Sequence, residues 1–153
     1  MRETGALLSA ILRVTHPDLY MAGRNSLIKI MSDHPNCKEA IARWPTVFNM
    51  VQIISNRQTP FHRDVSGQPT WYDLLVTLGS YQRATLALRN IGIRVAYRPG
   101  SIALISSLLL HHGVAEVDPD RLCYSWFMTD AVHTNQSIPT VSWMRGDRYP
   151  LPL

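Results

Sequence analysis

The first third of the chain spaces its apolar residues with the period of an α-helix. They recur three or four positions apart between Ala6 and Val14, which predicts an amphipathic helix there. A second helix is expected over Leu19 to Met31, after the start signal His16-Pro17-Asp18. A short third helix is expected from Cys37 to Trp44. Residues 1–44 should therefore form a helical brace.

From Pro45 onward the apolar residues instead form short runs typical of β-strands, separated by turn signals rich in Gly, Pro, Asn and Asp. The runs are Val47-Phe48 with Val51 and Ile53-Ile54, Leu74 to Leu78, Thr85 to Leu88, Ile91 to Tyr97, Ile102 to Ile105 and Leu122 to Met128. Several short strands without helices between them predict a closed antiparallel sandwich or jelly roll, not a parallel α/β sheet. The fold class is mainly β with N-terminal helices, an α+β arrangement.

The length of 153 residues suits one domain, and 46% hydrophobic with 17% charged residues is a globular balance. We expect a single domain over residues 1–153, with the brace at 1–44, a β core at 45–130 and a C-terminal extension at 131–153. From Thr134, with Pro139, Pro150 and Pro152, this extension should run extended over the surface. No apolar run approaches the roughly 18 residues of a membrane span, and no secretory signal is recognised.

Cysteine content and charge limit the cellular environment and the kinds of ligand that suit the chain. Cys37 and Cys123 are too few for a disulfide framework or a cysteine-rich zinc module, which suits a reducing, intracellular environment. Thirteen arginines against two lysines contribute to a net charge of +4. The planar arginine fork fits carboxylate or phosphate groups. Six arginines from Arg57 to Arg98 face only two acidic residues, so this basic middle would suit phosphate contacts.

Candidate metal ligands lie in the β half. His62 and Asp64 are two positions apart, which on a strand places both side chains on one face. This triplet alone is equally compatible with a structural role. A second histidine about fifty positions later, in His111-His112, completes a set of two histidines and one carboxylate. That set is the facial triad of non-haem Fe(II) oxygenases, which leaves three coordination positions open.

In this order, with Arg121 following, the residues resemble the 2-oxoglutarate- and Fe(II)-dependent oxygenases, which have a double-stranded β-helix, a jelly-roll or cupin-like variant. More specifically they look like the TET/JBP group of nucleic-acid base oxygenases, in particular its single-domain fungal members. The stretches that carry the resemblance are Asn56-Arg57-x-Thr59-Pro60-x-His62-Arg63-Asp64, Trp71-Tyr72-Asp73-Leu74-Leu75, Tyr97-Arg98-Pro99-Gly100, His112-Gly113-Val114-x-Glu116-Val117-Asp118 and Arg121-x-Cys123-Tyr124-x-Trp126. They cover roughly residues 45–130.

The resemblance implies that His62, Asp64 and His112 bind Fe(II) and form the catalytic centre. It also implies that Arg121 binds the distal carboxylate of the cosubstrate 2-oxoglutarate, with O2 as the other reactant. Strand alternation places Cys123 on the same face as Arg121, where it is a second candidate cosubstrate contact.

Composition leaves His111 and His112 open as ligands. The nine-residue gap to Arg121 and the following Gly-Val favour His112, and strand alternation directs His111 to the opposite face. We interpret the remaining histidines, His16, His34 and His133, as surface residues.

By resemblance, the expected activity is hydroxylation or oxidation of a methylated base, 5-methylcytosine or thymine, in nucleic acid, with DNA favoured over RNA. Candidate substrate contacts are Asn56, Arg57, Arg63 and Asp130. The positions at which 5-methylcytosine oxidases carry polar base-reading residues are Gly67 and Thr129 here. A nuclear location, a monomer and a separate targeting partner are expected. Two alternatives stay open: the same chemistry on a small molecule or protein side chain, and a non-catalytic jelly-roll binding module.

Overall fold

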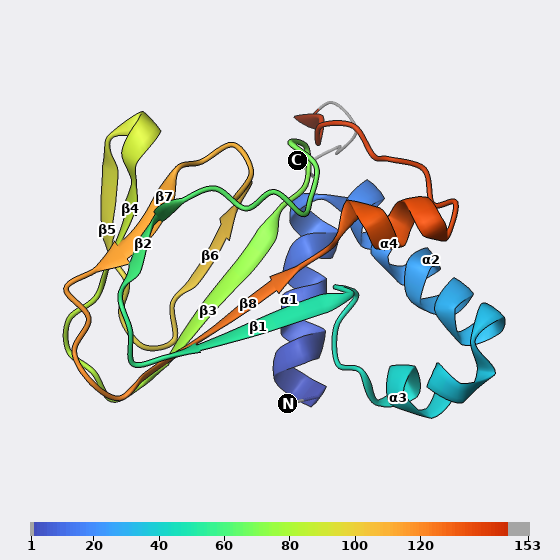
Figure 1. The fold of residues 1–153 in the computed structure, drawn as a ribbon, viewed down its shortest axis with the longest axis horizontal. Helices are drawn as coiled ribbons and strands as arrows, with labels where there is room; N and C mark the ends of the chain where they lie inside the picture. The colour runs from blue at the N-terminus through green and yellow to red at the C-terminus, as the bar shows by residue number, and fades with distance from the viewer. Residues whose placement is uncertain (1, 147–153) are drawn as a thin grey trace, which may run out of the picture.

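The structure is a computed structural model that describes residues 2–146, and it begins with helices that lie to one side of the strands (Figure 1). These are α1 (Arg2–Thr15), α2 (Pro17–Asp33) and α3 (Lys38–Arg43), with the 3-10 turn η1 (Pro35–Cys37) between α2 and α3. The helical start expected from the apolar period is confirmed, to within a few residues at each end.

Eight strands follow and form two antiparallel four-stranded sheets, in the orders β1-β8-β3-β6 and β2-β7-β4-β5. Their bounds are β1 (Met50–Ser55), β2 (Thr59–His62), β3 (Asp73–Gly79), β4 (Thr85–Leu88), β5 (Ile93–Ala96), β6 (Ile102–Ile105), β7 (His112–Ala115) and β8 (Arg121–Phe127). The strand pairs are nested: β4 pairs with β5, β3 with β6, β2 with β7 and β1 with β8. This is the pairing of a jelly roll, so the expected α+β jelly roll is confirmed.

Some expected element bounds are wrong. Val47 and Phe48 lie before β1, where they are apolar because they fill the core beneath the helices. The run that begins at Ile91 starts as the 3-10 turn η2 (Arg89–Ile91), and Gly92, with φ 68°, separates it from β5. A helix that the sequence did not predict, α4 (Asp130–Asn135), lies at the start of the C-terminal extension, and the extended segment expected from Thr134 overlaps only its last two residues. Residues 147–153 of the extension, with Pro150 and Pro152, lie outside the described residues.

Two apolar clusters hold the layers together. One joins α1 and α2 to the outer face of the β1-β8-β3-β6 sheet, and the other fills the space between the sheets. Neighbours on β3 divide between them: Leu74 and Val76 pack against the helices and Leu75 points between the sheets, as strand alternation requires. The first cluster comprises Leu8, Leu12, Leu19, Val47, Phe48, Trp71, Leu74, Val76, Trp126 and Met128. Burial of each large side chain contributes about 1.5–3 kcal/mol.

Helix α2 approaches the end of β8 very closely, at Gly23. A Cβ atom added there would lie 2.3 Å from the Met128 side chain and 2.5 Å from the Val47 carbonyl oxygen. Only glycine therefore fits without movement of the neighbouring chain. Among the described residues, the helices are too short or too polar to span a bilayer.

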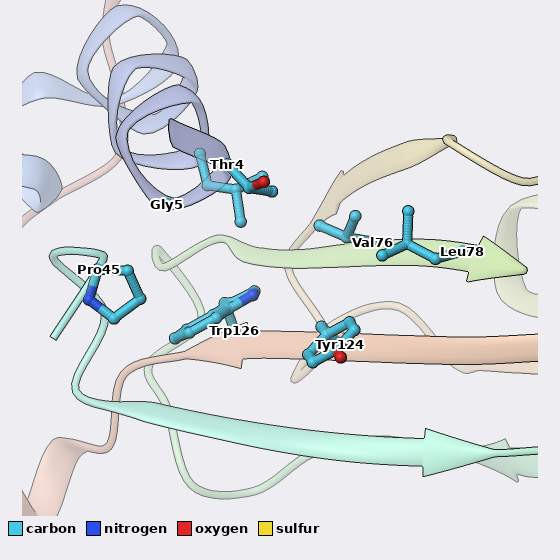
Figure 2. A pocket seen from close by; sticks show the side chains of 8 residues that line it. Thr4, Gly5, Pro45, Val76, Leu78, Tyr124 and Trp126 are labelled. Carbon is cyan, nitrogen blue, oxygen red and sulfur yellow. The ribbon is translucent and has the colours of Figure 1, made fainter. Parts of the chain in front are cut away.

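A cleft separates the start of α1 from the outer face of β3 and β8 (Figure 2). It is lined by Thr4, Gly5, Leu8, Pro45, Val76, Leu78, Tyr124 and Trp126. This lining offers no imidazole, thiolate or carboxylate, so the cleft has no metal-binding chemistry. A second cavity, on the other face of the same sheet, does contain side chains that can bind a metal.

His16 and His133, both expected at the surface, are instead buried, each only 1% exposed. His16 is the N-cap of α2, and its Nδ1 accepts a hydrogen bond of 3.3 Å from the Leu19 N–H. The ring of His133, on α4, lies 4.6 Å from the ring of Trp71. Tertiary packing over the loop before β3 therefore overrides the usual preference of histidine for the surface.

Candidate metal and cosubstrate site

Three side chains with metal-binding atoms converge between the two sheets. His62 ends β2, His112 begins β7, and the two are cross-strand partners. Nε2 of His62 lies 3.3 Å from Oδ1 of Asp64, and Nε2 of His112 lies 3.9 Å from Oδ2 of the same carboxylate. One ligand atom from each residue lies within 4.8 Å of the others. Within residues 2–146, no second group of three or more His, Cys, Asp and Glu is gathered in this way.

Asp64 reaches this cluster from a loop and not, as expected, from the strand that carries His62. β2 ends at His62 because its partner β7 begins at His112, so no backbone continues the ladder. The β2–β7 register also shifts between Thr59 and His62. Such an irregularity changes the direction of side chains, and both Thr59 and His62 line the cavity although they are three positions apart.

Both histidine rings are oriented by a backbone carbonyl two residues earlier. Nδ1 of His62 is 2.8 Å from the Pro60 oxygen, and Nδ1 of His112 is 2.9 Å from the Leu110 oxygen. A carbonyl oxygen only accepts hydrogen bonds, so in a neutral ring the proton lies on Nδ1 and the lone pair on Nε2. Metal-binding histidines are fixed in this way, with the free nitrogen directed at the ion.

The electrostatic surroundings keep His112 uncharged. Burial lowers its pKa below the usual 6.5; the hydrogen bond to Leu110 opposes this shift, and the neighbouring His62 adds to it. Neutral imidazole is the metal-binding form. Two neutral imidazoles and one carboxylate suit a ferrous ion, because they occupy one face of an octahedron and leave the other positions free.

Arg121 lies in the same cavity as a buried cation that forms no ion pair with any described residue. It is the first residue of β8, is 1% exposed and lines the cavity. Its guanidinium carbon lies 5.2 Å from the centre of the Tyr97 ring. Its Nε and Nη1 atoms have no hydrogen-bond partner among the described residues. Because a buried, unpaired charge is costly, the side chain is chemically suited to a small anion such as a dicarboxylate.

Cys123 follows Arg121 on the inward face of β8. Its Sγ atom is 3.8 Å from the Tyr97 hydroxyl oxygen. Burial raises the pKa of the thiol, against the opposing effect of Arg121, so the group is a neutral wall of the cavity rather than a thiolate. Burial likewise raises the pKa of Tyr97.

The cavity between the sheets has about 380 Å³ of space that no protein atom fills, part of it open to solvent. Its lining comes from both sheets: Gln52, Ile54, Thr59, His62, Asp64, Leu75, Tyr97, His112, Val114, Arg121, Cys123 and Ser125. Sequence reasoning missed Gln52, Tyr97 and Ser125. Strand alternation from Arg121 was the available signal for Ser125, and the motif around Tyr97 marked the stretch without assigning a role to the ring.

Another residue that sequence reasoning missed, Asp73, supports the loop that carries Asp64. The Ser107 hydroxyl donates a hydrogen bond to the Asp73 carboxylate, and the Ser107 carbonyl accepts one of 3.1 Å from the Asp64 N–H. Burial raises the pKa of Asp73 to about 7, with the Ser107 hydrogen bond opposing the shift. Asp73 thus acts on the metal cluster indirectly, through Ser107.

The four candidate substrate contacts lie outside the lining of this cavity. Arg57 and Arg63 are exposed. Asp130 begins α4, and its N–H donates to the Ser66 carbonyl. Asn56 is engaged with the backbone of Arg121 at the start of β8.

The structure also separates the two adjacent histidines. His112 joins the metal cluster, whereas the ring of His111 lies 5.6 Å from the ring of Phe61.

A jelly roll with two histidines, a carboxylate and a buried arginine in one cavity defines the class of Fe(II)- and 2-oxoglutarate-dependent oxygenases. A family model, Tet_JBP, described as the oxygenase domain of the 2OGFeDO superfamily, matches residues 1–130. The chain therefore belongs to the TET/JBP oxygenase family, as the sequence motifs predicted. No curated protein matches the chain.

Membership sets the cofactors: enzymes of this superfamily use Fe(II), 2-oxoglutarate and O2. The donor set fits the metal, and the buried guanidinium, with Nε and Nη1 free of hydrogen bonds within the described residues, fits the cosubstrate. The match also extends over the helical brace, in which the sequence showed no motif.

Proposed function

We propose that this chain is a 2-oxoglutarate- and Fe(II)-dependent dioxygenase that oxidises a methylated base in nucleic acid, 5-methylcytosine or thymine, with DNA favoured over RNA. The observation that supports it best is the meeting of the His62-Asp64-His112 cluster and the buried Arg121 in one cavity. The first three residues would hold Fe(II), and Arg121 would bind the distal carboxylate of 2-oxoglutarate.

Each residue has a distinct task in this proposal. The Nδ1–H groups of His62 and His112 donate to carbonyls, which keeps both Nε2 atoms directed at the ion. Arg121 orients the cosubstrate by its charge and planar fork. Bound Fe(II) would couple the oxidative decarboxylation of 2-oxoglutarate by O2 to hydroxylation of a substrate C–H bond, leaving succinate and CO2. Apolar side chains on the cavity wall, such as Leu75 and Val114, limit the access of water.

The charge of the chain supports nucleic acid as the substrate. Arg57 and Arg63 flank the strand that carries His62, are exposed and form no ion pair in the described part of the chain. Free arginines beside the site would contact phosphates. A base in duplex DNA would have to be flipped out of the stack to reach the metal. The proposal includes a nuclear location, action as a monomer and a partner protein that selects the target.

The metal and cosubstrate assignments are tested by anaerobic spectroscopy. Adding Fe(II) and 2-oxoglutarate should produce a visible charge-transfer band. We expect His62→Ala, Asp64→Ala and His112→Ala each to abolish this band, whereas His111→Ala, the matched control at the adjacent histidine, retains it. A wild-type chain without the band would support a non-catalytic binding module.

The substrate assignment is tested separately. Methylated DNA and RNA are incubated with the enzyme, and the nucleosides are analysed by mass spectrometry, with iron or 2-oxoglutarate omitted as controls. Oxidised 5-methylcytidine or thymidine products that depend on both cofactors are expected. A chain that shows the band but oxidises no nucleic acid would contradict the substrate and point to a small molecule or protein side chain.

A further inference from the structure

The backbone around Arg121 adopts an uncommon conformation on three sides. Asn56 has φ 50° and Asp120 has φ 65°, both in the left-handed region, and Gly79 has φ 128°. Asp120 precedes Arg121 in the chain, Gly79 is its cross-strand partner on β3, and Asn56 is hydrogen-bonded to it from the end of β1. Backbone strain of this kind tends to accumulate at functional sites.

On the β3 side there is no room for adjustment. A Cβ atom added at Gly79 would lie 1.8 Å from the Asp120 carbonyl oxygen and 3.3 Å from the Arg121 Cα. The Asp120 carboxylate in turn accepts a hydrogen bond of 3.0 Å from the Ser80 N–H. These contacts fix the turn that leads into β8.

On the β1 side, Asn56 holds Arg121 at two points. The Asn56 side-chain oxygen Oδ1 accepts a hydrogen bond of 2.8 Å from the Arg121 N–H. The Asn56 N–H donates one of 2.8 Å to the Arg121 carbonyl. Asparagine is one of the few residues with a side chain that tolerates the left-handed conformation, so this position combines an unusual φ with a specific acceptor.

We propose that Asn56 is a positioning residue for cosubstrate binding: its side-chain amide fixes the first residue of β8 and thereby directs the Arg121 guanidinium toward the 2-oxoglutarate carboxylate. The inference rests on the proposed function, in which Arg121 binds that carboxylate. It also gives Asn56 a role different from the substrate contact expected from the sequence.

The surroundings of the guanidinium explain why the backbone anchor matters. Nε and Nη1 of Arg121 have no hydrogen-bond partner in the part of the chain that the structure describes, and the carbon between them lies over the Tyr97 ring. Within residues 2–146, no acidic side chain forms an ion pair with the guanidinium to hold it in place. A change in backbone position at residue 121 would move the charge relative to the metal cluster, and with it the point at which the cosubstrate carboxylate is bound.

The test separates the acceptor from the backbone conformation. Asn56→Gly tolerates the positive φ but lacks the acceptor, whereas Asn56→Asp retains both. Ser137→Gly is the matched control, because Ser137 is another exposed residue with φ 55° but belongs to the C-terminal extension. Dissociation constants for Mn(II) and then for 2-oxoglutarate are measured by calorimetry on the full chain, together with the unfolding midpoint without cosubstrate.

We expect Asn56→Gly to weaken 2-oxoglutarate binding about tenfold, the effect of one lost hydrogen bond, while Mn(II) affinity stays within about twofold of wild type. Asn56→Asp and Ser137→Gly should bind 2-oxoglutarate within about threefold of wild type. A purely structural role would lower the unfolding midpoint without changing cosubstrate affinity selectively. If Asn56→Gly does not fold, Asn56→Ser, with its shorter acceptor, takes its place with the same expected loss.

Two negative outcomes are distinguishable. A wild-type chain that binds Mn(II) but no 2-oxoglutarate would overturn the proposed function, and this inference with it. A wild-type chain that binds 2-oxoglutarate, together with an Asn56→Gly chain that binds it equally well, would overturn the inference alone.

Discussion

Arg121 is the residue at which stability and function conflict most directly. Its side chain is 1% exposed, and two of its nitrogen atoms have no partner in the described part of the chain. The free energy of folding must therefore offset the desolvation of a charge that has no counter-ion. An anionic cosubstrate would supply the missing partner, so binding should stabilise the folded chain through mass action.

Replacing this charge should therefore separate the two properties. We expect Arg121→Met, which is of similar length and uncharged, to raise the free energy of unfolding of the metal-free chain by about 1–3 kcal/mol and to abolish 2-oxoglutarate binding. Urea denaturation and calorimetry measure the two effects, with Arg121→Lys as the control that keeps the charge. A less stable Arg121→Met chain would mean that the guanidinium stabilises the empty fold.

The predictability of individual residues follows from the kind of role they have. His62, Asp64 and His112 could be selected from the sequence because metal chemistry restricts ligands to a few residue types. The roles of Asp73 and Asn56 could not be predicted, because they depend on hydrogen bonds to residues 34 and 65 positions away. In the sequence, Asn56 looks like any asparagine in a turn. Only the fold shows that its side-chain oxygen accepts a hydrogen bond from the Arg121 N–H.

At the scale of elements, α4 depends on packing rather than on its own sequence. It has six residues, too few for a helix to be stable alone in water. Its His133 ring packs on Trp71, and the Asp130 N–H donates to the Ser66 carbonyl, which ties the helix to the loop that carries Asp64. This dependence also explains why the sequence did not predict the helix.

Burial of His133 makes the stability of this region dependent on pH. Burial lowers the pKa of His133 below 6.5, and Asp130 only partly opposes this. Below about pH 6.5 the unfolded chain therefore binds a proton at His133 that the folded chain does not. The free energy of unfolding is highest above that pH and decreases as the pH falls toward the lower pKa of His133 in the folded chain. For one such histidine the slope is at most about 1.4 kcal/mol per pH unit.

His133→Phe should keep the aromatic contact with Trp71 and reduce this acid sensitivity. The check is the free energy of unfolding of the metal-free chain in urea at pH 8 and pH 5.5. His34→Phe, at an exposed histidine, serves as the control and should leave the difference between the two pH values unchanged. Equal acid sensitivity in His133→Phe and wild type would show that His133 is not responsible.

The longer elements were predictable for the opposite reason. Helices α1 and α2 carry the apolar period over 14 and 17 residues, and most strands are bounded by glycine, proline or aspartate turns. Val47 and Phe48 show the limit of this signal. Two adjacent apolar residues read equally well as a strand or as a buried connection, and the packing against α1 and α2 decides between them.

At the scale of the whole molecule, the uneven distribution of arginine provides a test of the nucleic-acid proposal. Binding to phosphates releases counter-ions, so the logarithm of the affinity falls linearly with the logarithm of salt concentration. We expect Arg57→Ala and Arg63→Ala each to reduce that slope by about 1. Fluorescence anisotropy with a labelled oligonucleotide at several salt concentrations measures it.

Arg43→Ala is the matched control for this series. Arg43 is also exposed, but it lies on α3 and pairs with Glu39 at 2.5 Å. Its replacement should leave the slope unchanged. Equal slopes for all three variants would place the phosphate contacts elsewhere on the molecule.

The nested strand pairs also indicate the order in which the parts of the site form during folding. The innermost pair, β4 with β5, is a local hairpin, whereas β1 and β8 lie at opposite ends of the core. Because closing longer loops costs more entropy, the pairs should zip from the inside outward. His62 meets His112 when β2 joins β7, and Arg121 reaches Asn56 only when the last pair closes. During synthesis, the emerging chain would gain the capacity for metal before that for cosubstrate.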